Sequence, residues 1–132
     1  MAPATGGLVV SFGTVTGAVR SAASASSSAR GAFSEILTQF PTSDLVPDAL
    51  FAIGQAFENE GNGTSADSIY ALVVQRHPKS ERAPTALYKR ATALRVTGQA
   101  AAAQVLYKQI VDQYPRSDAA VLAEGFLGRR KP

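Results

Sequence analysis

Apolar side chains recur every three or four residues through much of the chain, which is the spacing of one face of an amphipathic helix. Gly61-Asn62-Gly63 separates two such stripes, and glycine adopts a left-handed turn conformation at little cost. The pattern predicts a helical hairpin at about 48–76, with Thr64 or Ser65 capping its second helix. The first stripe holds Ala49, Leu50, Ile53, Ala56 and Phe57, and the second holds Ala66, Ile69, Tyr70, Val73 and Val74.

The same arrangement returns further along the chain, with Gly98 between two stripes. This predicts a second hairpin at about 85–114, and a leading helix is expected at about 29–40. Alanine is abundant and no period-two alternation persists, so the expected fold class is all-α. The third stripe holds Ala83, Leu87, Ala91 and Leu94, and the fourth holds Ala103, Leu106, Tyr107, Ile110 and Val111.

A short phrase with a central proline occurs three times at a fixed distance. It centres on Pro41, Pro78 and Pro115, which are 37 residues apart. A constant period between 20 and 50 residues is typical of a solenoid of stacked units, and about three units fit in this chain. Because solenoids usually hold partners, the period favours a binding protein over an enzyme.

Each phrase also carries a signal for the start of a helix. Ser43, Ser80 and Ser117 are each followed by an acid. A serine oxygen accepts free N–H groups of a first helical turn, and the carboxylate complements the helix dipole, so these serines are predicted N-caps. Pro47 and Pro84, also 37 residues apart, suit a first turn, where a missing N–H does no harm.

The composition limits the class of protein. With 132 residues and 45% hydrophobic residues, the chain can form one packed domain. Cysteine is absent, so disulfide and thiol sites are excluded. No run of 18 or more apolar residues occurs, and a membrane span is therefore not expected.

The net charge of +3 is unevenly distributed. Residues 31–75 hold six acids and no base, whereas residues 76–116 hold eight bases and two acids. Nucleic acid is not an expected partner, because it would need a clustered basic face with aromatic residues for stacking. Residues 129–132 are interpreted as a solvated basic tail. The charge pattern is therefore an acidic half followed by a basic half.

Residues 1–28 fit the helical pattern poorly. They are rich in glycine, serine, alanine and valine, and Arg20 falls where a buried stripe is expected. The segment is predicted to be poorly defined or a degraded first helix. Sequence foreign to the domain, or a cleaved signal peptide ending near Ala22–Ala29, are the alternatives. The repeat domain is placed at residues 29–128.

Arrangements for catalysis or metal binding are not found in the sequence. His77 is the only histidine, so neither a histidine pair for a metal nor a Ser–His–Asp triad can form. Gly61–Thr64 lacks the Gly-Lys-Ser/Thr ending of a phosphate loop. Glu58 and Glu60 are two residues apart and point to different sides of a helix. The sequence predicts no enzyme, no catalytic residue, no metal site and no cofactor.

The spacing of large and small residues resembles the tetratricopeptide repeat. This resemblance implies a right-handed solenoid of helix hairpins with about three repeats, whose period of 37 residues exceeds the usual 34. The residues that carry it are Leu50, Ile53, Gly54, Phe57, Ala66, Tyr70 and Pro78 in one unit, and Leu87, Ala91, Leu94, Ala103, Tyr107 and Pro115 in the next.

The longer period narrows the resemblance to a subgroup. The Y-P-x-S phrase and the stretch Ser80-Glu81-Arg82-Ala83-Pro84-Thr85-Ala86-Leu87 are similar to the C-terminal repeat domain of the Tol-Pal accessory proteins YbgF/CpoB. This resemblance implies a periplasmic protein that contacts a TolA-like partner and coordinates the cell envelope during division. BamD-like outer-membrane assembly lipoproteins share the phrase and give one alternative. A self-associating array, in which the acidic half of one copy meets the basic half of another, is the second.

A candidate binding face follows from the repeat register. In repeats of this type the first helices line a concave surface, and their residues outside the packing stripe face a protein or peptide partner. Phe51 and Tyr88 share a register position and are expected to lie off the buried stripe as aromatic anchors. Simple coverage of neighbouring helices by the two rings is the alternative. The candidates are Asp48, Phe51, Gln55, Glu58 and Asn59 in the first hairpin, and Thr85, Tyr88, Lys89, Thr92 and Arg95 in the second.

Overall fold

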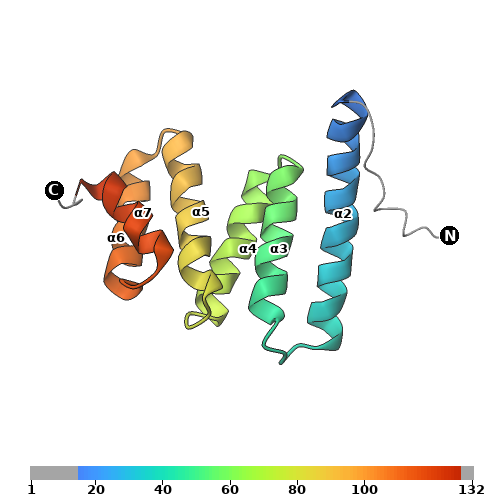
Figure 1. Ribbon diagram of the computed structural model, residues 1–132, viewed down its shortest axis with the longest axis horizontal. Coiled ribbons are helices and arrows are strands. Elements are labelled where there is room, and N and C mark those ends of the chain that lie inside the picture. The colour runs from blue at the N-terminus through green and yellow to red at the C-terminus, as the bar shows by residue number, and fades with distance from the viewer. Residues whose placement is uncertain (1–14, 129–132) are drawn as a thin grey trace. The chain divides into compact units, whose positions relative to one another are not determined.

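The chain forms an all-α structure, as the apolar spacing predicts. The computed structural model describes residues 15–128, with side chains from residue 26 onward. The residues group into two compact units that divide after Ile69, within the third helix, and we call them the N-terminal and the C-terminal unit. The described range contains no strand and six helices (Figure 1): α2 (Val15–Gln39), α3 (Val46–Asn59), α4 (Gly63–Arg76), α5 (Arg82–Val96), α6 (Ala100–Gln113) and α7 (Asp118–Leu127).

The leading helix is longer than the sequence predicts. α2 runs for 25 residues from Val15, so the predicted start near residue 29 is wrong. Extending an existing helix costs far less than nucleating a new one, and alanine has the highest helix propensity, so the Ser/Ala-rich stretch continues the helix. Residues 15–28 of the segment predicted to be poorly defined or a degraded first helix are therefore helical. Residues 1–14 lie outside the described part of the chain.

α3 lies beside α2 in the N-terminal unit (Figure 1). Phe57 of α3 is half-buried, and the guanidinium of Arg30 in α2 lies 4.3 Å from its ring centroid. The same guanidinium donates two hydrogen bonds to the carboxylate of Glu60, at 3.1 and 2.9 Å, which ties α2 to the C-terminal end of α3. The predicted stripe of α3 is buried at Ala49, Leu50, Ile53 and Ala56.

Both turns predicted from glycine are confirmed. Gly61 and Gly98 adopt φ values of +82° and +89°, in the left-handed region that favours glycine. The cap of α4 differs from the prediction. The backbone N–H of Ser65 donates to Asn62 Oδ1 at 3.1 Å, so Asn62 rather than Thr64 or Ser65 satisfies the first turn of that helix.

Of the three predicted serine caps, only Ser117 caps its helix. Its hydroxyl oxygen accepts the N–H of Ala120 at 3.0 Å at the start of α7. Ser43 and Ser80 accept the N–H two residues further on, also at 3.0 Å, and α3 and α5 begin without a side-chain cap. A serine hydroxyl can accept a nearby backbone N–H in a non-helical turn. This local hydrogen bond stabilises a turn just before the helix in place of a helix cap.

α5, α6 and α7 make up most of the C-terminal unit. α7 packs against both α5 and α6, and its small alanine side chains allow a close approach. The predicted stripes of α5 and α6 are confirmed as packing faces. The buried core of this unit consists of Leu87, Ala91, Ala103, Tyr107, Ile110, Ala119, Ala120 and Ala123.

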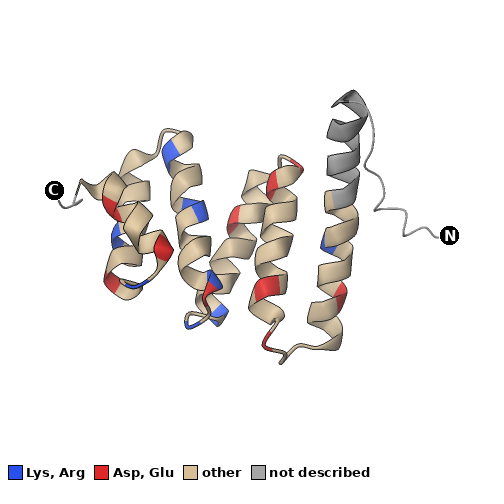
Figure 2. Ribbon diagram, in the orientation of Figure 1, with Lys and Arg blue, Asp and Glu red and all other residues tan. Residues whose placement is uncertain are grey.

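Charge differs between the elements of the two units. α3 carries Asp and Glu and no base, as the red residues of Figure 2 show. α5 carries four bases and no acid, shown in blue in the same figure. The acidic and basic halves of the sequence therefore give the N-terminal unit an acidic α3 and the C-terminal unit a basic α5.

Candidate functional site

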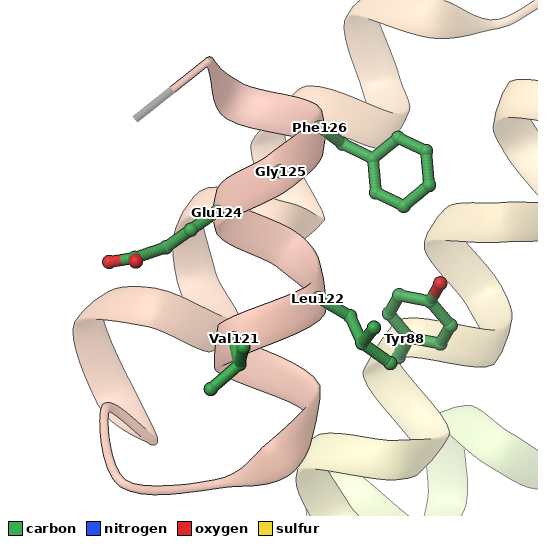
Figure 3. Close-up of a pocket in the computed structure, with 6 residues that line it drawn as sticks. All are labelled: Tyr88, Val121, Leu122, Glu124, Gly125 and Phe126. Carbon is green, nitrogen blue, oxygen red and sulfur yellow. The ribbon is translucent and has the colours of Figure 1, made fainter. Parts of the chain in front are cut away.

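An open pocket of about 530 Å³ lies between α5 and α7 in the C-terminal unit (Figure 3). Leu122 and Phe126 of α7 extend toward α5 and Tyr88, whereas Val121 and Glu124 point away from it (Figure 3). The surface between the two helices is therefore apolar. The lining residues are Tyr88, Val121, Leu122, Glu124, Gly125 and Phe126.

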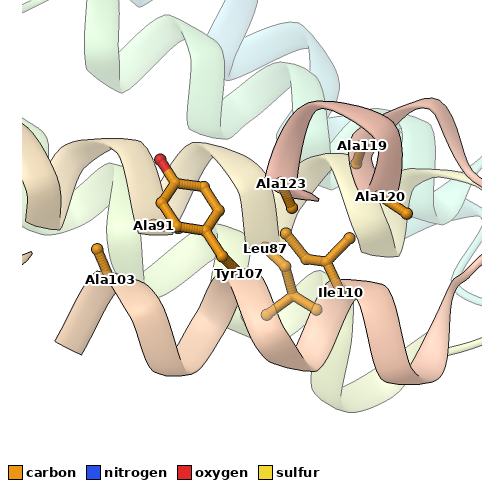
Figure 4. Close-up of a cluster of buried hydrophobic side chains, with 8 residues drawn as sticks. All are labelled: Leu87, Ala91, Ala103, Tyr107, Ile110, Ala119, Ala120 and Ala123. Atoms are coloured by element: carbon orange, nitrogen blue, oxygen red, sulfur yellow. The ribbon is translucent and has the colours of Figure 1, made fainter. Parts of the chain in front are cut away.

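Three aromatic rings pack together beside this pocket. Tyr107 of α6 is 0% exposed and lies within the buried core (Figure 4). Its ring stacks on Phe126 with centroids 4.8 Å apart, and Tyr88 lies 5.9 Å from Tyr107 and 6.4 Å from Phe126. The hydroxyl oxygens of Tyr107 and Thr92 are 3.3 Å apart. These contacts hold the lining rings in place, so the pocket is pre-formed.

A basic side chain lies beside the apolar lining on the α5 side. Arg95 is exposed, and its guanidinium lies 4.6 Å from the ring centroid of Phe126, within the range of a cation–π interaction. Lys89 follows Tyr88 on the same helix and is half-buried. Glu124 is the acid among the lining residues. The positive charge of α5 therefore suits a ligand with acidic residues next to an apolar one.

The candidate residues of the second hairpin all lie on α5. Tyr88, Thr92 and Arg95 gather at the ring cluster, while Thr85 and Lys89 are half-buried on the same helix. The structure thus brings three of the five to the ring cluster, and one of them, Tyr88, lines the pocket. Their part in binding stays a prediction.

Phe51 differs from the other candidates of the first hairpin. Its side chain is only 4% exposed, so the expectation that it lies off the buried stripe as a free anchor is wrong. α3 buries a broader face than the predicted stripe, because Val46 and Gly54 are buried as well. The remaining four candidates are exposed on this helix: Asp48, Gln55, Glu58 and Asn59.

The residues that sequence reasoning missed all belong to α7. Leu122, Gly125 and Phe126 line the pocket, and none is among the predicted site residues. The repeat register does contain a signal for Gly125. It lies 37 residues after Tyr88, at the position where both preceding units carry an aromatic ring. Gly125 lines the pocket without the aromatic side chain that the two preceding copies carry.

The described residues contain few other functional features. Among residues 15–128, no group of three or more His, Cys, Asp or Glu side chains could hold a metal ion. In the same range, no helix has both the length and the apolar character needed to cross a membrane. The Tyr114 hydroxyl donates to the Pro78 carbonyl oxygen at 2.7 Å, and burial raises the pKa of this tyrosine. This hydrogen bond ties one proline loop to the next.

Comparison with known proteins agrees with the hairpin architecture. The tetratricopeptide repeat matches residues 48–80, which cover most of α3 and all of α4, and residues 85–117, which cover most of α5 and all of α6. The two matches begin 37 residues apart and together span half of the chain. No curated protein matches the chain. From these matches and the hairpins that they cover, the chain belongs to the tetratricopeptide repeat family.

Proposed function

We propose that the chain is a protein-interaction module that binds a segment of another protein in the pocket between α5 and α7. Tetratricopeptide repeats generally mediate protein–protein interactions. The observation that carries the proposal is the exposure of two apolar side chains in this pocket, Leu122 at 53% and Phe126 at 37%. Side chains held by a packed ring cluster lose little conformational freedom on binding, which favours affinity.

The binding mechanism combines an apolar anchor with charged residues at the rim. An apolar side chain of the partner fills the pocket and removes Leu122 and Phe126 from water. Desolvated anchors of this kind commonly contribute about 2 kcal/mol or more each. Lys89 and Arg95 attract and orient acidic residues of the partner, mainly by raising the association rate, and salt weakens this effect. No catalytic role is proposed.

The cellular role that we propose rests on the narrower sequence resemblance. The Y-P-x-S phrase at Tyr114–Ser117 and the stretch Ser80–Leu87 are similar to YbgF/CpoB repeat domains. By that resemblance, the partner is a TolA-like protein and the site of action is the periplasm. Binding there coordinates envelope constriction with peptidoglycan synthesis during cell division.

Isothermal titration calorimetry of the purified chain with the TolA-like protein of the same genome tests this role. Leu122→Ser should raise the dissociation constant about tenfold or more, which is ~1.4 kcal/mol or more. Val105→Ser is the matched control, because Val105 is also exposed and apolar but lies on α6 outside the pocket lining. Unchanged affinity of Leu122→Ser would refute the pocket, and absence of binding by the wild type would refute the TolA-like partner.

A further inference from the structure

The loop between α2 and α3 exposes two large apolar side chains. Phe40 is 57% exposed and Leu45 is 59% exposed. Hydrogen bonds hold the backbone of this loop. The N–H of Phe40 donates to the Ile36 carbonyl oxygen at 2.8 Å, and the N–H of Leu45 donates to Ser43 Oγ at 3.0 Å. The loop therefore presents both side chains from a hydrogen-bonded turn, which reduces the ordering cost of a contact.

The equivalent position of the last repeat is packed instead. Tyr114 occupies the register position of Phe40, two periods later, and is half-buried. Its hydroxyl donates to Pro78, and Phe40 has no hydroxyl that could make such a bond. His77, the intermediate copy, is also half-buried. Phe40 is therefore the copy of this position that presents its ring to solvent.

The charges around this loop are opposite to those beside the pocket. Glu35, Asp44 and Asp48 lie within five residues of Phe40 or Leu45, and residues 31–75 contain no base. The pocket lies between α5, which carries four bases and no acid, and α7, which carries Asp118 and Glu124. An acidic surface with exposed apolar side chains matches the apolar pocket in polarity, and matches its basic α5 side in charge.

We propose that the α2–α3 loop of one copy of this chain docks in the α5–α7 pocket of a second copy. The Phe40 ring enters the pocket at Gly125, beside Tyr88 and Phe126. The acids of the loop face the bases of α5, with Arg95 at the rim. This inference rests on the proposed function, because it names a competing occupant of the same pocket. Self-docking thus regulates access of a partner segment to the site.

The contact joins two different surfaces and is therefore heterologous. In a pair, one copy keeps an unused pocket and the other keeps an unused loop, so association continues to chains or closes to a ring. One loop in one pocket makes a small interface, which places the contact at the weak and transient end of the range. Association should rise with protein concentration and fall with salt, because charge attraction between exposed groups is screened.

Sedimentation velocity of the full chain over a concentration series tests the contact. The loop variant carries Phe40→Ser with Leu45→Ser, the pocket variant carries Leu122→Glu, and Val105→Ser is the control. All these positions are exposed, and circular dichroism checks that helicity is kept. The wild type and the control should associate, whereas each variant alone should stay monomeric. An equimolar mixture of the two variants should form a 1:1 dimer that grows no further, because one intact loop and one intact pocket remain.

A labelled peptide of residues 35–48, followed by fluorescence anisotropy, separates self-docking from partner binding. It should bind the wild type, and Leu122→Glu should weaken its binding about tenfold or more. A wild type that stays monomeric while its pocket still binds a partner segment would overturn self-docking and leave the proposed function standing. If both the loop variant and the pocket variant still self-associate, self-docking is overturned, because the contact between copies then lies elsewhere. Leu122→Glu that changes neither self-association nor partner binding would overturn both proposals.

Discussion

Tyr107→Ala is the change that most directly tests the packing of the C-terminal unit. Tyr107 is fully buried, and its ring stacks on Phe126 with a centroid separation of 4.8 Å. Truncating a buried aromatic side chain removes its transfer free energy and leaves a cavity, at a cost of about 3–5 kcal/mol. For a unit of this size, we expect the melting temperature to fall by about 10 °C or more.

Tyr107→Phe is the matched control, because it keeps the ring and removes only the hydroxyl. That hydroxyl lies 3.3 Å from the Thr92 hydroxyl, and a neutral hydrogen bond of this length contributes about 0.5–1 kcal/mol. The alanine variant should therefore be less stable than the phenylalanine variant by about 2 kcal/mol or more. Urea unfolding followed by circular dichroism measures the two free energies of unfolding.

Hydrogen exchange of peptides from α5, α6 and α7 must accompany the unfolding curves. The chain contains two compact units, and the unfolding of one need not report on the other. Faster exchange should appear in the C-terminal unit of Tyr107→Ala, and ligand binding should weaken because Phe126 loses its stacking partner. Equal stability of the alanine and phenylalanine variants would refute the packing argument. A loss of protection confined to the N-terminal unit would refute the assignment of Tyr107 to this core.

Four further predictions have defined outcomes. Arg30→Met and Glu60→Gln should each lower the free energy of unfolding, and a double-mutant cycle should give a coupling of about 1 kcal/mol that salt reduces, because both side chains are partly exposed. Gly98→Ala should cost about 1–2 kcal/mol in urea unfolding, since a φ of +89° is unfavourable for a residue with a Cβ. Burial raises the pKa of Tyr114, so the folded state favours the neutral phenol. Stability should then be unaffected by this group below the pKa of an unfolded tyrosine, about 10, and fall as the pH rises above it. Tyr114→Phe should reduce this alkaline loss in melting curves recorded against pH. Gly125→Tyr should fill the pocket and abolish ligand binding in calorimetry without lowering the melting temperature, because it also removes a glycine from a helix interior. Retained binding by this variant would contradict the location of the site.

The two hairpins can be predicted from the sequence because each apolar stripe has a copy 37 residues away. Repetition encodes the same packing twice, and α3 to α6 lie within a few residues of their expected bounds. The start of α2 at Val15 could not be predicted in this way, since helix propensity is a weak prior and extension of an existing helix decides the outcome. At Ser43 and Ser80 the hydroxyl oxygen can accept an N–H of the turn or an N–H of the first helical turn. The sequence does not decide between these two hydrogen bonds.

The pocket could be predicted only in part. The register places Tyr88 and Arg95 on α5, and both lie at the ring cluster. Phe51 shares the register of Tyr88 but is buried. The face that a helix buries depends on the elements packed against it, and not only on its own apolar stripe. Leu122 and Phe126 were beyond prediction from two complete hairpins. The site lies between α5 and α7, and α7 follows the second predicted hairpin.

Two positions depart from the repeat because their side chains do not pack as the other copies of the same position do. Gly125 stands where preceding units carry an aromatic ring, and it removes apolar volume from the surface of the C-terminal unit. Phe40 stands where the last repeat carries Tyr114, and it adds exposed apolar volume to the N-terminal unit. One departure removes apolar volume and the other adds it, and the acids near Phe40 are opposite in sign to the bases of α5. Packing alone gives no reason for this complementarity, whereas docking between copies does. A pocket variant that blocks both self-association and partner binding would therefore support one site with two competing occupants.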